Sequence, residues 1–370
     1  MDQVVVVISD CHLSAGRFYE NKLNPHEDFN FDDELVDLVH HFSSGHYGNR
    51  HGKEVPVDLF IAGDFLDFLN VPIEGEFEDR VTETVSLKKL EAILKGHPKV
   101  WAAFREFCKK PNKKIRYLIG NHDADLFFDS VRKRIIQEWD PDGLEESSKV
   151  ELIADVDHIN YPGGVEIHHG NQFEPGNDMD FKKPFVEKGK DRLLSLPWGS
   201  VYVLKIVNRL KWEREYINKI RPIKAFVFFG ILFDPFFTIK YVFLSIFYFV
   251  RTRFSSPFQK GGVSSAMDIL GEELNVFQDL ERPARKILDE KKEIKTVVFG
   301  HTHRPMDKIY PDGKQYINTG TWTKMIDLDW RGLGQQFRRT FAYIEINQGQ
   351  SACELREWVG HRGPHKAFGR

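Results

Sequence analysis

Short apolar runs alternate with amphipathic segments along this chain. Five runs rich in Val, Ile and Phe have the length and composition of buried strands; they are QVVVVIS (3–9), VDLFIAG (57–63), IRYLIG (115–120), VEIHH (165–169) and KTVVFG (295–300). Between them, apolar residues recur with the helical period at 32–42, 87–94 and 126–139. Strands that alternate with helices predict an α/β domain, whose ligands gather beyond the carboxyl ends of its strands. Two further strand-like runs, 315–320 and 340–346, predict a second sheet, mixed or antiparallel.

Polar residues that could bind metal stand at the end of each of the five predicted strands. The segments are Asp10-Cys11-His12, Gly63-Asp64-Phe65-Leu66-Asp67, Gly120-Asn121-His122-Asp123, His168-His169-Gly170 and Gly300-His301-Thr302-His303. One such motif alone is common in surface loops, but five at successive strand ends indicate a single site. Carboxylate, amide and imidazole donors without thiolates suit Mn, Fe or Zn better than Mg. Seven strong ligand candidates exceed the need of one ion and predict two divalent ions that share a carboxylate.

Composition and charge argue against nucleic acid as the partner and against a disulfide-rich protein. The 370 residues carry a net charge of -3, which gives no reason to expect nucleic acid as the partner. The three cysteines are widely spaced and predict neither a disulfide framework nor a thiolate metal site. The N-terminal apolar run is too short for a signal peptide, so we expect a cytoplasmic protein.

The ordered motifs DxH, GDxxD, GNHD, HG and GHTH resemble the calcineurin-like metallophosphoesterase family over residues 10–303, and NTGTW (318–322) resembles its closing segment. The resemblance implies two packed mixed β-sheets flanked by helices, with a dinuclear centre at one edge. It also implies hydrolysis of a P–O bond by a hydroxide that bridges the two ions.

The same resemblance implies a role for each site residue. Asp10, His12 and His303 would hold the first ion. Asn121, His169 and His301 would hold the second, and Asp64 would bridge. His122 would be the catalytic histidine, with its ring oriented by Asp67. His168 competes with His169 as the ligand, but His169 directly precedes the glycine and His168 faces the opposite side of its strand.

Within the family, GHTHRP (300–305) and NTGTW are most similar to the branch that contains UDP-2,3-diacylglucosamine pyrophosphatases. Members of that branch carry a helical insertion between the HG and GHTH motifs that receives acyl chains. Two positions depart from the branch: His122 stands where Arg is usual, and Asn171 stands where an acidic residue is usual.

The gap between these two motifs predicts a helical, basic and hydrophobic insertion at 176–290, set into a phosphoesterase domain formed by 1–175 and 291–370. Within it, AFVFFGILFDPFFTIKYVFLSIFYFV (225–250) is nearly apolar. Asp234-Pro235 and Lys240 interrupt this run, and a single crossing would separate His169 from His301, so we do not expect a membrane span.

Seven basic residues between 205 and 224 precede the apolar run and predict contact with an anionic membrane surface. The expected substrate or lipid contacts are Arg304, Phe226, Phe229, Phe233 and Phe237. The plain alternative is that both stretches are core helices or a dimer interface.

The sequence therefore predicts a dinuclear phosphoesterase or pyrophosphatase with two divalent ions, Mn first and Fe or Zn as alternatives. The expected substrate is lipid-linked, such as a UDP-diacylglucosamine-like compound, met on the inner face of the cytoplasmic membrane. The alternative is a soluble phosphatase or nucleotidase of the same family. A non-catalytic scaffold would be expected to lose ligands, and all seven are present.

Overall fold

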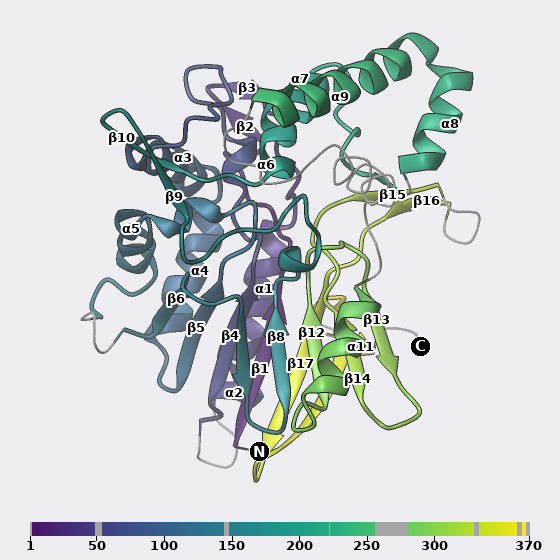
Figure 1. Ribbon diagram of the computed structural model, residues 1–370. Helices are drawn as coiled ribbons and strands as arrows, with labels where there is room; N and C mark the ends of the chain where they lie inside the picture. Colours follow the sequence, from purple (N-terminus) through teal and green to yellow (C-terminus); the bar gives the residue numbers. More distant parts are fainter. Residues whose placement is uncertain are drawn as a thin grey trace.

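Two mixed β-sheets form the centre of the protein in a computed structural model (Figure 1). The structure describes residues 2–48, 54–143, 148–221, 223–255, 280–328, 333–360 and 365–367. The first sheet has seven strands in the order β19-β18-β17-β1-β4-β5-β6. Their bounds are Gln3–Ile8 (β1), Val57–Ala62 (β4), Lys113–Leu118 (β5), Val150–Ile153 (β6), Thr340–Asn347 (β17), Gln350–Trp358 (β18) and His365–Ala367 (β19). Strands β1, β4, β5 and β6 are parallel, and β17 pairs antiparallel to β1.

The second sheet has five strands in the order β13-β14-β12-β8-β7. They span His158–Tyr161 (β7), Val165–His168 (β8), Thr296–Phe299 (β12), Met306–Ile309 (β13) and Gln315–Asn318 (β14). The three central strands are parallel, and β7 and β13 run antiparallel at the edges. All seven strands predicted from apolar runs are present, and the expected α/β fold with two mixed sheets is confirmed. The two last runs do not share a sheet as predicted, because 315–320 contributes β14 to the second sheet and 340–346 contributes β17 to the first.

Alternate residues of β1 enter two different cores, which explains why its apolar run is unbroken. Val5 and Val7 pack between the sheets with Ile167 and Val298 of the second sheet. Val4, Val6 and Ile8 face the helices on the other side. Strands buried on both faces read as continuous apolar runs rather than alternating ones.

Helices cover the outer face of each sheet and complete four layers. Those on the first sheet are α1 (Asp32–Ser43), α3 (Glu83–Gly96), α4 (Pro98–Lys109) and α5 (Asp129–Trp139). On the second sheet, Ala284 and Leu288 of α11 (Glu281–Glu290) are buried against Val297 and Phe299 of β12. Helix α4 and the nine-residue strand β18 were not predicted from the sequence.

The segment between the HG and GHTH motifs contains helices α6 to α9, which lie above the sheets in Figure 1. A hairpin of β9 (Phe185–Lys188) and β10 (Asp191–Leu194) precedes α6 (Trp198–Tyr202), a π-helical turn (Val203–Val207) and α7 (Asn208–Lys211). Strand β11 (Ile220–Arg221) leads to α8 (Ile223–Phe233) and α9 (Pro235–Ser255), which are separated by Asp234. Among the described residues, no helix combines the length and apolarity needed to cross a membrane. The division at residues 175 and 291 stays a prediction.

The structure corrects the role predicted for two of the basic residues of this segment. Lys211 is fully buried, and its Nζ lies 2.9 Å from a carboxylate oxygen of Asp28. Lys219 pairs with the same carboxylate at 3.0 Å. Burial raises the pKa of Asp28, but the charges of the two lysines lower it by a larger amount. The net pKa of Asp28 is therefore below its ordinary value. These side chains fix α7 to the body of the protein instead of facing a lipid surface.

Two more of the seven basic residues are also paired within the protein. Lys205 lies 3.0 Å from Asp79, and Arg214 lies 2.8 Å from Asp234. Four of the seven basic residues at 205–224 therefore form ion pairs within the protein.

A buried histidine joins α1 to α4 and gives the fold a pH-dependent contact. The ring of His97 lies 3.1 Å from Glu27 and 2.9 Å from Asp32. Burial lowers the pKa of His97, but the two carboxylates outweigh it and raise that pKa to about 9.

We expect His97→Gln to lower the free energy of unfolding by about 3 kcal/mol at pH 6, because it leaves the buried Glu27 and the partly exposed Asp32 without their cation. The folded pKa lies above the ordinary value of 6.5, so the stabilisation is full below pH 6.5 and is lost as the pH rises through about 9. Urea denaturation of both proteins at pH 6 and pH 10 measures the gap, which should narrow at pH 10. His46→Gln, at an exposed position, is the control; an equal gap at both pH values would contradict the pairing.

Candidate metal centre

The five predicted segments converge where the carboxyl ends of the parallel strands meet. Backbone hydrogen bonds join the first two loops: Asp10 N donates to Gly63 O at 3.1 Å, and His12 N donates to Asp64 O at 3.0 Å. Across the sheets, Gly300 N donates to His169 O at 2.9 Å. Loops from both sheets therefore contribute to one site.

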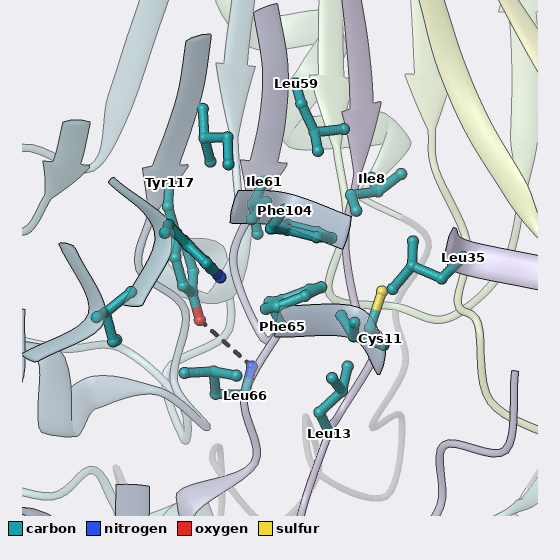
Figure 2. Packing of buried hydrophobic residues seen from close by; sticks show 14 of the residues in the cluster. Ile8, Cys11, Leu13, Leu35, Leu59, Ile61, Phe65, Leu66, Phe104 and Tyr117 are labelled. Carbon is teal, nitrogen blue, oxygen red and sulfur yellow. Dashed lines mark hydrogen bonds between the residues drawn. The ribbon is translucent and has the colours of Figure 1, made fainter. Parts of the chain in front are cut away.

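Apolar residues between the polar ones anchor these loops. Figure 2 shows Cys11, Leu13, Phe65 and Leu66 packed with Phe104 in the core beneath the site. Each of these five side chains is fully buried. The ligand candidates thus alternate with residues that hold the loop by burial, which limits how far the polar groups can move.

Five ligand candidates adopt the left-handed backbone region that residues other than glycine rarely occupy. They are Asp10 (φ 50°), His12 (φ 56°), Asp64 (φ 51°), His301 (φ 67°) and His303 (φ 59°). Each such residue costs on the order of 1 kcal/mol, and such conformations cluster at functional sites. The packing and hydrogen bonds of the loops must offset that cost.

The first group of polar atoms comes from Asp10, His12 and His303. Nε2 of His12 lies 3.0 Å from Nε2 of His303, and Oδ1 of Asp10 lies 3.3 Å from Nε2 of His303. Oδ1 of Asp10 is buried without a hydrogen bond of acceptable geometry. Two ring nitrogens that face each other can share one proton at most, whereas a cation would satisfy both nitrogens and the carboxylate. This donor set fits a divalent ion.

The second group contains Asp64, His169 and His301, with Asn121 beside them. Nε2 of His169 lies 3.3 Å from Oδ2 of Asp64 and 3.3 Å from Oδ1 of Asn121. Nδ1 of His169 lies 2.8 Å from the carbonyl of Ala62. That bond holds a proton on Nδ1, so Nε2 is the nitrogen through which His169 would bind an ion. The predicted ligands of the second ion are thus brought together.

Asp67 holds two histidines at once. Its Oδ1 lies 3.1 Å from Nδ1 of His122, and its Oδ2 lies 3.3 Å from Nδ1 of His12. The side-chain amide of Asn70 donates to Oδ2 at 2.6 Å. Orientation of His122 was expected from the sequence; the contact with His12 and the support from Asn70 were not.

Charge pairing keeps the carboxylates ionised despite their burial. Burial raises the pKa of Asp64, but the charges of His169 and His122 move that pKa well below its usual range. Burial lowers the pKa of His122, but the charges of Asp67 and Asp64 raise it to about 9. The two carboxylates thus favour the protonated form of the His122 ring.

Other predicted residues lie outside both groups. His168 bonds Glu166 at 2.8 Å and is absent from the metal groups found among the described residues. The side chain of Arg304 is exposed, and its contact with a substrate stays a prediction. Phe229 and Phe233 are exposed as lipid contacts require, but Phe226 and Phe237 are buried in the cluster beneath α8 and α9, which corrects their predicted role.

Two carboxylates at the site were not assigned a role from the sequence. Oδ2 of Asp123 accepts a hydrogen bond from Phe65 N at 3.0 Å and another from the hydroxyl of Tyr117. It thereby joins the loops that follow β4 and β5. Oε2 of Glu174 lies 2.6 Å from Nε2 of His301. The sequence signal for Glu174 is an acidic residue five positions after His169.

Gly120 stands where the backbone passes closest to the site. A Cβ at this position would lie 2.8 Å from Nε2 of His169 and still closer to Oδ1 of Asp64. A methyl group at this position would therefore displace both Asp64 and His169.

We expect Gly120→Ala to weaken binding of Mn²⁺ or Zn²⁺ by about tenfold or more, because the added methyl displaces Asp64 and His169. Calorimetric titration of the metal-stripped protein gives the affinity, and circular dichroism verifies the fold. Gly48→Ala is the matched control, since its Cβ would meet Ser43 O at an ordinary 3.5 Å. Unchanged affinity in Gly120→Ala would show that these residues do not bind the ion.

Comparisons with known proteins give only distant likenesses. No family model matches the chain, and no curated protein matches it. Among solved structures, a dimetal phosphatase from Danio rerio is 12% identical with a TM-score of 0.39, over 99% of this chain and 98% of that one. A predicted phosphoesterase from Streptococcus pneumoniae is 12% identical with a TM-score of 0.27, over 100% and 98%.

A Vps29 from Entamoeba histolytica complexed with zinc is 23% identical with a TM-score of 0.17. Its alignment covers 24% of this chain and 45% of that one, so the match spans less than half of the Vps29. With identities and scores this low, we base the function on the geometry of the site.

Proposed function

We propose that this protein is a metal-dependent phosphoesterase with two divalent ions. The observation that carries the proposal is the pair of adjoining donor groups, Asp10–His12–His303 and Asp64–His169–His301, beside a histidine held by Asp67. In this proposal Asn121 completes the second group and Asp64 is shared. Ions held there, Mn²⁺ first and Fe or Zn as alternatives, would activate water and neutralise the charge of the phosphoryl oxygens.

His122 is the proposed catalytic residue. Its side chain is 19% exposed, whereas that of Asp67 behind it is 1% exposed, so the histidine can meet a substrate. Because Nδ1 bonds Asp67, Nε2 is the nitrogen left to donate a proton to a phosphoryl oxygen or to the leaving group. The backbone N of His122 also donates to Oδ1 of Asp64 at 2.8 Å, which ties the catalytic histidine to the shared carboxylate.

We expect His122→Asn to retain both ions and to lower kcat by about 10²- to 10⁴-fold, because it removes only the proton donor. Hydrolysis of bis-p-nitrophenyl phosphate with Mn²⁺ present measures the rate, and elemental analysis measures the ions. Asp64→Asn should instead lose ions and activity together. His46→Asn, at an exposed position, controls for loss of a histidine. Phosphoesterase activity that survives His122→Asn unchanged would exclude this catalytic role.

We further propose a lipid-linked substrate met at a membrane surface, with a soluble phosphatase or nucleotidase as the alternative. The support is an apolar face on α8 and α9. Ten large hydrophobic side chains on these helices are exposed; they are Phe228, Phe229, Ile231, Leu232, Phe233, Phe236, Ile239, Phe243, Ile246 and Phe247. Such a contiguous surface is rarely left in water.

The most exposed of these side chains lie at the turn between the two helices. Phe233 is 82% exposed and Phe236 is 88% exposed, on either side of Asp234–Pro235. The opposite face of α8 and α9 packs on the protein through Phe226, Phe237 and Tyr241. One face of the two helices is thus fixed to the protein, and the other is available to lipid. Because four of the seven basic residues are paired internally, the apolar face supports this proposal better than charge does.

We expect the double variant Phe233→Ser/Phe236→Ser to bind lipid vesicles about tenfold more weakly, because it removes apolar area that would enter the bilayer. Sedimentation with phosphatidylcholine vesicles, with and without phosphatidylglycerol, measures binding. Hydrolysis of the soluble aryl phosphate should be unchanged. The control is Ile309→Ser/Val359→Ser, two exposed apolar residues far along the chain from the hairpin. Wild-type protein that ignores both vesicles, or a dimer that the double variant dissociates, would refute the lipid surface.

A further inference from the structure

Glu174 makes a direct side-chain contact with His301 of the candidate centre, and no role has been given to this glutamate so far. Oε2 of Glu174 lies 2.6 Å from Nε2 of His301. The histidine side chain is 9% exposed and the glutamate side chain is 21% exposed. A hydrogen bond to a carboxylate in this setting is strong and directional.

The contact determines which nitrogen of His301 is available to the site. An imidazole has two ring nitrogens, and a partner that engages one of them selects the other for a ligand. His169 follows this rule, since the carbonyl of Ala62 holds its Nδ1 and its Nε2 meets Asp64 and Asn121. In His301 the held nitrogen is Nε2, so Nδ1 is the nitrogen that remains for an ion.

The position of Glu174 is fixed before any ion binds. Gly170, with φ 116°, starts a 3₁₀ turn over Asn171–Phe173 that ends at Glu174. The ring of Phe173 stacks on Phe299 at 5.3 Å, and Phe299 is the last residue of β12, two before His301. The turn is therefore packed on the strand that carries the histidine.

A second contact orients the carboxylate itself. Nδ2 of Asn177 donates to Oε2 of Glu174 at 2.6 Å, and the backbone N of Asn177 donates to the backbone O of Glu174 at 2.8 Å. Gly199 N in turn donates to Gly176 O at 2.7 Å, which links this loop to α6. Glu174 thus has little freedom to leave His301.

The two donor groups differ in this support. In the second group, both histidines have their outward nitrogen engaged, His169 by a carbonyl and His301 by Glu174. In the first group, Oδ2 of Asp67 engages Nδ1 of His12, whereas Nδ1 of His303 is buried without a hydrogen-bond partner. A carboxylate behind a histidine ligand raises its basicity and fixes its ring, so Glu174 adds to the affinity of the second position as Asp67 does to that of the first.

We propose that Glu174 is the positioning residue of His301 and sets the affinity of the second metal position. This inference rests on the proposed dinuclear function, and it assigns Glu174 no contact with the substrate. It predicts that loss of the carboxylate weakens one ion of the pair and leaves the other unchanged.

Glu174→Gln tests the inference, because the amide keeps the shape and removes the charge. The metal-stripped wild type, titrated calorimetrically with Zn²⁺ and separately with Mn²⁺, should bind two ions. Glu174→Gln should bind the first with unchanged affinity and the second about 10- to 100-fold more weakly. Thermal unfolding of the metal-stripped proteins should coincide, which a merely structural role for Glu174 would not allow. Glu187→Gln, an exposed glutamate of β9, makes the same charge change away from the site.

Two further variants make the result specific. His303→Ala removes a ligand of the first group, so the ion that remains reports the second position directly and should weaken when Glu174→Gln is added. Asn177→Ala keeps the carboxylate but frees it, and should weaken the second ion by a smaller factor. Equal two-ion binding by wild type and Glu174→Gln would overturn the role of Glu174 alone. A wild type that binds no ion would overturn the proposed function itself.

Discussion

Mutual compensation of buried charge at the shared edge of the two sheets is the condition on which the rest of the structure depends. Asp10, Asp64 and Asp67 are each 1% exposed or less. Isolated carboxylates at such depth would cost several kcal/mol each. Imidazoles from both sheets stand beside them, so neither sheet alone could carry its half of the site.

That compensation also explains the unusual backbone of the loops. Ser9, next to Asp10, hydrogen-bonds Thr319 at 2.6 Å, and the hydroxyl of Thr321 donates to the backbone O of Asp10 at 2.6 Å. His301 N donates to Oδ2 of Asp10 at 2.9 Å. Left-handed residues persist here because neighbouring segments over-determine their positions. Strain and buried charge are offset by the same set of contacts.

The strands and the histidine and carboxylate groups could be predicted because their signals are local. An unbroken apolar run such as 3–9 requires burial on both faces, and a parallel sheet brings the polar residues that follow to one edge. Glu174 could not be predicted, since its contact with His301 depends on a 3₁₀ turn and on the stacking of Phe173. The partner of Lys211 is Asp28, 183 positions earlier. A basic stretch has the same sequence pattern whether its side chains meet lipid or a buried aspartate. The phenylalanines of α8 and α9 divide into inward and outward sets only once the tertiary contacts exist.

The antiparallel pairing of β17 with β1 has a consequence for the order in which the molecule forms. Strand β1 is synthesised first, yet β17, one of its two neighbours, begins at Thr340, and polar groups beside Asp10 come from residues 301 to 321. Contacts this distant in sequence form slowly, because loop closure precedes any gain from pairing. On the ribosome, Asp10 meets His303 only after all the residues between them have been synthesised. Until β17 has been synthesised, the apolar strand β1 has one unpaired edge. The nascent chain must keep that edge from pairing with other chains.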